Sequence, residues 1–312
     1  MRDFGGKIAV VTGGGTGMGR ELARQLAALG CHVAMCDVSA ENMEEARELC
    51  RKDAPAGTRV TTHECDVSEE AEVLAFRDAV VREHGTDHVN LLFNNAGIAG
   101  GGSFVAGERE EWEKTFGVCW SGVYFCCRAF VPLVVASSEG HIVNTSSVNG
   151  FWASLGPVTP HTAYSAAKFA VKGFSEALLT DLRLNAPHVN VSVVMPGHVG
   201  TSIAINTGRV LGHPSPKEMT ESDLAQVRER WAKMGAPVDG MSNDELRAAM
   251  EQRQIAFRDN APLSAAGAAT IILDGVRAKE WRILVGEDAK ALDERVRSSP
   301  WDVYDPSFRG AS

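Results

Sequence analysis

Short runs rich in valine and isoleucine alternate with helix-like stretches along most of this chain of 312 residues. Several of these runs are apolar throughout, as in parallel strands that are covered on both faces. Strands separated by helices imply right-handed crossovers, so the pattern predicts an α/β fold with a doubly wound parallel sheet. The expected strands are 8–11, 33–36, 60–63, 91–93, 142–144, 189–195 and 283–285, and the expected helices are 19–29, 40–52, 69–83, 109–135 and 163–184.

One region, residues 202–262, interrupts this alternation and contains no convincing strand. Two amphipathic helices are expected there, the first capped by Ser222 and the second opened by a capping box of Ser242 and Glu245. We expect a helical lid over a substrate pocket, inserted into a single domain that spans residues 1–312. A purely structural excursion is the alternative.

Composition excludes several classes of protein. The formal net charge of −9 leaves no basic face for nucleic acid, and no apolar run approaches the ~20 residues of a membrane span. The seven cysteines form a scattered, odd set without a CxxC pair, so neither a disulfide framework nor a metal site is expected. Residues 1–15 hold no signal-peptide hydrophobic region, and a cytoplasmic location is expected.

A glycine-rich string, TGGGTGMG at residues 12–19, joins the first expected strand to the first helix. Residues without side chains let the backbone approach a pyrophosphate, and the helix N-terminus supplies amide donors. Asp37 ends the second strand, where a carboxylate accepts hydrogen bonds from an adenosine ribose. These features predict a dinucleotide site on a Rossmann-like fold, although Asp37 also fits a turn residue that caps the next helix.

The same carboxylate favours NAD over NADP as the cofactor. A ribose 2′-phosphate beside Asp37 would meet like charge at a cost of several kcal/mol. No arginine or lysine lies between Gly13 and Gly19 to offset that repulsion.

Tyr164 and Lys168 lie four residues apart in YSAAK, on one side of an expected helix. A free phenol has a pKa of about 10, too high for proton exchange at neutral pH, and a nearby ammonium favours the phenolate. The pair is therefore suited to exchange a proton with an alcohol oxygen. The spacing alone also fits a surface pair.

At this point the chain resembles the short-chain dehydrogenase/reductase family along almost its whole length. The resemblance implies reversible hydride transfer between NAD and a secondary alcohol or its ketone, and homodimers or homotetramers that pair helices 109–135 and 163–184. The motifs that carry it occur in the family's order: TGGGTGMG at 12–19, Asp37, Asp66-Val67, NNAG at 94–97, Ser146-Ser147, YSAAK at 164–168 and PGHVGT at 196–201.

The resemblance also assigns roles by position. The family's catalytic serine precedes two variable residues and a glycine, which selects Ser147, followed by VNG, over Ser146. Ser147 is expected to hold the substrate oxygen and Tyr164 to exchange its proton. Lys168 is expected to lower the pKa of Tyr164 and bind the nicotinamide ribose. The expected cofactor-binding residues are Gly13, Gly15, Thr16, Gly17, Met18, Asp37, Asp66, Val67, Asn94, Ala96, Gly97, Tyr164, Lys168, Pro196, Gly197, Val199 and Thr201, and for Asp66 and Asn95 a structural role is the alternative.

Cys119 departs from the family pattern. Members commonly have asparagine in the matching segment 118–123, where it anchors a water that connects Lys168 to solvent. A thiol is only a weak donor and acceptor. Three outcomes are open: water or backbone groups substitute, activity is slowed, or the fold is kept with little catalysis.

The expected function is that of an oxidoreductase, because Ser147, Tyr164 and Lys168 are intact. The alternative function is that of a catalytically weak dinucleotide-binding sensor or interaction protein on the same fold. Cys119 is the one sequence feature that favours this alternative. An epimerase or dehydratase of the extended type would need a larger C-terminal substrate domain than this chain offers.

The identity of the substrate is indicated only by an expected apolar wall, which suits a lipid-, steroid- or terpenoid-like alcohol unless these residues are simply core. His161 and His198 lie near the site in sequence, and the segment 301–306 is expected to join an interface or to fold back on its own subunit. The wall residues are Phe151, Trp152, Leu155, Ile203 and Ile205, with the helices of Trp231 and Phe257 above them.

Overall fold

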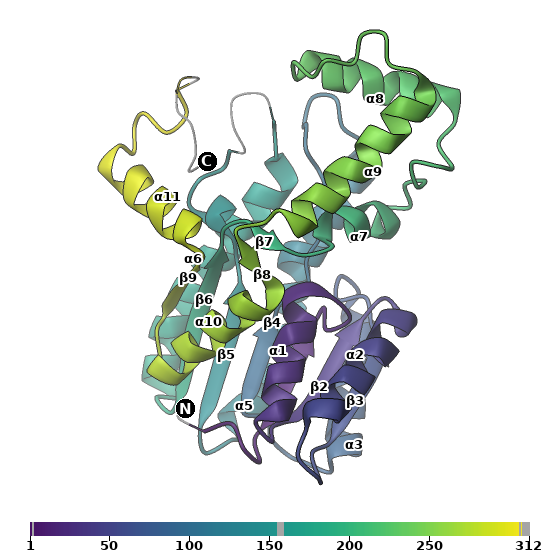
Figure 1. The fold of residues 1–312 in the computed structure, drawn as a ribbon. Helices are drawn as coiled ribbons and strands as arrows, with labels where there is room; N and C mark the ends of the chain where they lie inside the picture. Colours follow the sequence, from purple (N-terminus) through teal and green to yellow (C-terminus); the bar gives the residue numbers. More distant parts are fainter. Residues whose placement is uncertain (2, 155–158, 306, 308–312) are drawn as a thin grey trace.

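A central sheet of seven strands organises the computed structural model, which describes residues 1, 3–154, 159–305 and 307 (Figure 1). The strand order is β3-β2-β1-β4-β5-β6-β9, and every neighbouring pair is parallel. This order, which reverses between β1 and β4, confirms the doubly wound sheet in a single domain. The strands are β1 (Ile8–Thr12), β2 (His32–Asp37), β3 (Val60–Glu64), β4 (Leu91–Asn94), β5 (Gly140–Thr145), β6 (Val189–Pro196) and β9 (Arg282–Val285).

Helices cover both faces of this sheet (Figure 1). Alternate strand residues point to opposite faces, so that Val10 and Leu92 enter one core while Ala9 and Leu91 enter the other. The first core is covered by α3 (Glu70–His84), α5 (Gly122–Val135) and α6 (Thr162–Asn185), and the second by α1 (Gly17–Ala28), α2 (Ala40–Asp53) and α10 (Ala265–Ala278).

The expected helix at 109–135 is continuous but changes its winding in the middle. It consists of α4 (Arg109–Phe116), a five-residue π-helix η1 (Gly117–Ser121) and α5. Within the described residues it is the one helix long and apolar enough to cross a membrane, contrary to the expectation that no run comes near that length. Half of its most apolar 18-residue stretch is buried inside the protein. Buried core helices can have the same length and composition.

The insertion is helical, with α7 (Ile203–Val210), α8 (Glu221–Lys233) and α9 (Asn243–Asp259), and α8 and α9 project away from the sheet (Figure 1). It lies between β7 (Val199–Gly200) and β8 (Leu263–Ser264), which pair with each other. The expected capping box at the start of α9 is confirmed. The expected cap of α8 is wrong: the helix begins two residues earlier than a cap at Ser222 would place it, so Thr220 caps it, in a capping box with Asp223.

The projecting helices α8 and α9 have a small core of their own. Leu224 and Val227 of α8 pack with Leu246 of α9 and with Val238 between them, and Trp231 joins this cluster. Trp231 therefore packs within the helical hairpin instead of standing over a pocket, which corrects the expected position of this side chain.

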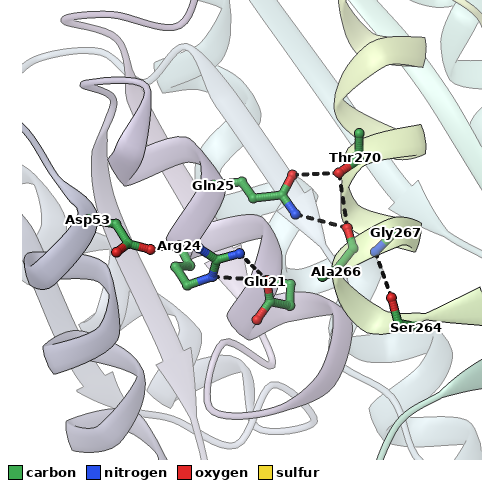
Figure 2. A network of polar contacts seen from close by, with 8 residues as sticks. All are labelled: Glu21, Arg24, Gln25, Asp53, Ser264, Ala266, Gly267 and Thr270. Atoms are coloured by element: carbon green, nitrogen blue, oxygen red, sulfur yellow. Dashed lines mark hydrogen bonds and ion pairs between the residues drawn. The ribbon is translucent and has the colours of Figure 1, made fainter.

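Polar contacts hold α1 from two sides (Figure 2). The Gln25 amide donates to the backbone carbonyl of Ala266 at 2.9 Å and accepts from the Thr270 hydroxyl at 3.1 Å, which ties α1 to α10. On the other side, Arg24 bonds Asp53 at the end of α2. The helix that begins at the glycine-rich loop is thus fixed relative to both neighbours.

Candidate active site

A cleft lies at the carboxyl ends of β1, β2 and β4, where ligands of doubly wound sheets bind. Ten of the predicted cofactor-binding residues line it: Gly13, Thr16, Gly17, Met18, Asp37, Asp66, Val67, Ala96, Gly97 and Thr201. Asn95, for which ligand contact was one of two expected roles, and Ile203, expected in the apolar wall, also line it. Other lining residues were not predicted: Val38, Ser39, Asn42, Cys65, Ile98, Val118, Asn206, Arg209 and Val210.

The glycine-rich loop needs glycine for two separate reasons. Gly13 and Gly17 have φ values of +66° and +55°, in the left-handed region that favours glycine. A Cβ on Gly19 would overlap the Gly13 backbone carbonyl, so the start of α1 packs directly on the loop. The glycines therefore leave the backbone of this loop accessible, so that a pyrophosphate can approach it closely.

Asp37 is bound to the same loop by backbone donors. Its carboxylate accepts the Gly15 N–H at 3.0 Å and the Ser39 N–H at 3.2 Å. Burial raises the pKa of Asp37, and these hydrogen bonds oppose that rise. Arg20 lies nearby, but it donates to the Gly15 carbonyl and forms a two-armed ion pair with Glu45. Asp37 thus presents a negative charge to the cleft.

Asp66 and Asn95 both line the cleft and both have structural partners. The Asp66 carboxylate accepts from Lys114 at 2.5 Å and from the Ser68 hydroxyl at 2.6 Å. Burial raises the pKa of Asp66, but these bonds outweigh it and the net shift is downward. The Asn95 amide donates to the Thr12 carbonyl at 3.2 Å and joins β4 to β1. A structural role is therefore present for each, beside any contact with a ligand.

Asn94, by contrast, is buried inside the sheet. Its amide donates to the Asn144 side chain on β5 at 2.8 Å. Gly15 faces Asp37, and Val199 is buried in β7. These three predicted residues shape the site from behind the cleft surface.

The predicted catalytic residues come together beside β5. Ser147 caps a short 3₁₀ helix, η2 (Val148–Gly150), and its hydroxyl is hydrogen-bonded to Tyr164 of α6. Lys168, one turn further along α6, places its ammonium 5.3 Å from the centre of the Tyr164 ring and donates to the Thr145 carbonyl at 2.8 Å. The Ser146 hydroxyl donates instead to the Lys168 backbone carbonyl, which leaves Ser147 as the serine facing Tyr164.

The expectation that Lys168 lowers the pKa of Tyr164 is not met. Burial raises the pKa of Tyr164 well above 10, the neighbouring Cys119 adds to the rise, and only the hydrogen bond from Ser147 lowers it. Burial also lowers the pKa of Lys168. The physical reason is desolvation, which disfavours the charged form of both groups.

Cys119 lies in the π-helical turn η1, where its buried thiol donates to the Ile98 carbonyl at 3.2 Å. The sulfur is close enough to Tyr164 and Lys168 to affect the titration of both. A Cβ on Gly97 would lie 3.5 Å from the Lys168 ammonium nitrogen and 3.7 Å from the Cys119 sulfur. The position that departs from the family is therefore inside the site.

The two nearby histidines have different surroundings. His161 stacks on the Tyr164 ring with centroids 4.6 Å apart, and burial lowers its pKa to about 4 although a backbone hydrogen bond to Ala99 opposes this. His161 is therefore neutral at pH 7. His198 turns toward α9, where Nε2 contacts the Phe257 carbonyl at 2.7 Å.

The expected apolar wall is only partly found at the cleft. Ile203 lines it, but Trp152 is buried in a separate cluster with Leu292 and Val303. Phe151 packs against that same cluster, and Leu155 lies outside the described residues. The core interpretation is thus correct for Trp152.

The first turn and last turn of α7 supply cleft residues of which only Ile203 was expected, as part of the apolar wall. Ile203, Asn206 and Val210 lie three to seven positions apart, on one helix face, and Asn206 donates to the Thr16 hydroxyl at 3.0 Å. That helical spacing was the available signal. Among the described residues no group of three or more His, Cys, Asp or Glu side chains is placed to hold a metal ion.

Comparison with known proteins gives a consistent result. The family model for short chain dehydrogenases matches residues 7–210. SadH of Mycobacterium tuberculosis is 34% identical over 95% of this chain and 92% of its own length. Human epidermal retinol dehydrogenase 2 is 33% identical over 72% of this chain and 70% of its own length.

Two solved structures are similar over the whole or most of the fold. A short-chain dehydrogenase/reductase of Burkholderia phymatum in complex with NAD has a TM-score of 0.74 and 30% identity, covering 96% of this chain and 97% of that one. A metagenomic short-chain oxidoreductase in complex with NADP has a TM-score of 0.55 and 33% identity, covering 62% of this chain and 83% of that one.

Proposed function

This chain belongs to the short-chain dehydrogenase/reductase family of oxidoreductases, and we propose that it uses NAD to interconvert an apolar secondary alcohol and its ketone. The observation that carries this proposal is the hydrogen-bonded pair of Ser147 and Tyr164 with Lys168 behind it, next to a cleft shaped for a dinucleotide. A nicotinamide dinucleotide supplies the hydride chemistry when it is bound.

The residues of this chain have the chemistry for the proton half of the reaction. During ketone reduction, the hydroxyls of Ser147 and Tyr164 donate hydrogen bonds to the substrate oxygen, and Tyr164 gives up its proton as negative charge develops there. The Lys168 ammonium, 5.3 Å from the centre of the ring, then offsets part of the desolvation cost that burial imposes on the phenolate. In alcohol oxidation the same groups act in reverse, and Tyr164 receives the hydroxyl proton.

Asp37 supports NAD in preference to NADP. Its carboxylate lines the cleft and is held there by the Gly15 and Ser39 amides. The nearby cation that would attract a 2′-phosphate, Arg20, is paired with Glu45. Like charge therefore opposes the extra phosphate.

An apolar substrate is supported by the lining of the cleft near α7, where Ile98, Val118, Ile203 and Val210 contribute side chains. A relative of this chain is named a retinol dehydrogenase, and retinoids are apolar.

The experiment screens secondary alcohols and ketones with NAD and with NADP, and compares the parent with the variant Tyr164→Phe. We expect parent turnover with NAD, loss of at least about a thousandfold in the variant because its ring cannot exchange a proton, and a Kd for NADH, measured by fluorescence, within about threefold of the parent. A parent that binds NADH but turns over no alcohol or ketone would instead favour the sensor, and a variant that keeps turnover within a few-fold would remove Tyr164 from its role.

Asp37→Ala tests the choice of cofactor separately. We expect the ratio of kcat/KM for NAD to that for NADP to fall by at least about tenfold, since a like-charge repulsion of more than about 1.4 kcal/mol is removed. An unchanged ratio would contradict the assignment of Asp37 to the ribose.

A further inference from the structure

Asp288, in the first turn of α11 (Glu287–Ser298), is wedged against the loop that follows β6. Its Oδ2 accepts the His198 backbone N–H at 2.6 Å, while Oδ1 is buried and has no hydrogen-bond partner among the described residues. A Cβ on Gly197 would overlap this carboxylate, and so would a Cβ on Gly286, whose φ is +106°. Two glycines thus leave the space that the Asp288 carboxylate occupies.

The segment after α11 contacts a second part of the site. The Trp152 indole N–H donates to the Val303 carbonyl at 3.1 Å, and the Ala153 N–H donates to the Tyr304 hydroxyl at 3.2 Å. Trp152 is buried against Leu292 and Val303. The expected alternative in which this segment folds back on its own subunit is therefore correct for Val303 and Tyr304.

These contacts reach two segments of the site, the one that follows Ser147 and the loop 196–201. Trp152 lies two residues after the short helix η2 that Ser147 caps, and Val148 of that helix packs on the same apolar cluster. Asp288 holds the loop 196–201, in which Thr201 lines the dinucleotide cleft. Residues 287–304 lie beyond the part of the chain that the family model covers.

We propose that Asp288, Val303 and Tyr304 position the active site of this chain, with Asp288 as the positioning residue for the loop 196–201, an inference that rests on the function proposed above. A carboxylate forms a stronger hydrogen bond to a backbone N–H than a neutral acceptor does. With the loop fixed in this way, Thr201 keeps its place in the lining of the dinucleotide cleft. Little binding energy is then spent on ordering the loop.

The test compares Asp288→Ala with Asp288→Asn in the full chain. The alanine removes the acceptor for the His198 N–H, so we expect the Kd for NADH, measured by fluorescence, to rise about tenfold or more, since a hydrogen bond to a charged group is lost. The asparagine keeps an acceptor oxygen and is expected to restore the Kd to within about threefold. The matched control is Glu287→Ala, because among the described residues this neighbouring exposed carboxylate bonds only Lys290 of the same helix and its loss should leave the Kd unchanged.

The hydrogen bond between Tyr304 and Ala153 is expected to affect kcat instead of the Kd for NADH. Tyr304→Phe removes the hydroxyl that accepts the Ala153 N–H, and we expect kcat to fall about threefold or more while the Kd for NADH stays at the parent value, because only the Ser147 side of the site is loosened.

Two results would overturn the proposal. One is an Asp288→Ala protein that is folded, as judged by its melting transition, and binds NADH within twofold of the parent. The other is a Tyr304→Phe protein with unchanged kcat. A parent that binds NADH but has no turnover would count against the proposed function alone, because the Kd comparison at Asp288 does not depend on catalysis.

Discussion

The thiol of Cys119 donates to the Ile98 carbonyl and lies beside the Lys168 ammonium. We predict that Cys119→Asn keeps or raises kcat, because an amide both donates to the Ile98 carbonyl and accepts from a water, whereas a thiol does either only weakly. Steady-state turnover per folded protein measures this.

The control for that substitution is Cys31→Ser. Cys31 is also buried and its thiol also donates to a carbonyl, that of Lys7 at 3.2 Å, but far from the site. It is expected to change stability and not kcat. A loss of about tenfold or more in Cys119→Asn, with NADH binding intact, would mean that the thiol itself is needed.

At the residue scale, the sequence predicted which side chains meet but not their environment. The four-residue spacing of Tyr164 and Lys168 fixes a shared helix face, and the structure has that face. Spacing says nothing about dehydration, and dehydration is the largest influence on the pKa of both groups. The same limit applies to Asp288, whose contact with His198 joins residues 90 positions apart.

At the scale of elements, the glycine-rich loop and α1 form one unit. We predict that Gly19→Ala raises the Kd for NADH by at least about a hundredfold, because its Cβ would overlap the Gly13 carbonyl and a shift of the loop disrupts the close approach to the pyrophosphate. Fluorescence titration with NADH measures it.

A matched substitution is available on α6. Gly173→Ala also replaces a helical glycine, but nothing lies within 4 Å of the added Cβ, so we expect an unchanged Kd and a stability gain of roughly 0.5–1 kcal/mol. If both alanine variants bound NADH like the parent, the loop would not form the pyrophosphate site.

A second element-scale prediction concerns the contact between β3 and α3. His84, the last residue of α3, is buried with Nε2 3.0 Å from the Thr61 hydroxyl, and burial lowers its pKa from 6.5 to about 4. Above pH 6.5 the ring is neutral in both states and contributes no pH dependence. As the pH falls from 6.5 toward 4, only the unfolded chain takes up the proton, so stability is lost through this window.

The variant that removes this effect is His84→Gln. Because the pKa of His84 is lowered on folding, the parent should lose about 2 kcal/mol of unfolding free energy through this residue between pH 7.5 and pH 5. The glutamine variant should lack this contribution, so its total loss over the same range should be smaller by about 2 kcal/mol. Denaturant unfolding at the two pH values measures the difference. His213→Gln, at an exposed site, is the control and should behave as the parent does; equal pH dependence in all three proteins would contradict the prediction.

Element types were predictable from the sequence where the periodicity is strong, and less so elsewhere. Several of the seven strands read as apolar runs because both faces of the sheet are covered. The helices α10 and α11 lie outside the predicted set, since α10 is rich in small residues that give little polar contrast. The cap of α8 was assigned to Ser222 because serine and threonine are both good caps, and only the structure decides between two such residues that lie close together.

At the scale of the whole molecule, the doubly wound parallel sheet followed from the alternation of strands and helices, but the path of the C-terminal segment did not. Trp152 and Val303 are 151 positions apart, and each alone reads as an ordinary core residue. No local rule pairs them. The apolar wall was misplaced for the same reason, since a tryptophan near the site is equally suited to a pocket or to a core.

The helices α5 and α6 leave apolar side chains on the surface, with Tyr124 41% and Phe169 42% exposed. The long helix that contains Tyr124 is also the one with the composition of a membrane span. Exposed apolar side chains gathered on neighbouring helices are typical of an interface between copies of a chain. We therefore predict that the protein forms homodimers or homotetramers through this face.

Sedimentation velocity of the parent and of Phe169→Glu measures this prediction. A carboxylate buried in an apolar interface is unpaired and costs several kcal/mol, so the variant should dissociate by at least one step at micromolar concentration while keeping its fold. Phe104→Glu is the matched control, because Phe104 is 76% exposed in the loop before α4 and lies on neither helix. A parent that sediments as a monomer, or a Phe169→Glu variant that assembles as the parent does, would mean that this face serves another contact.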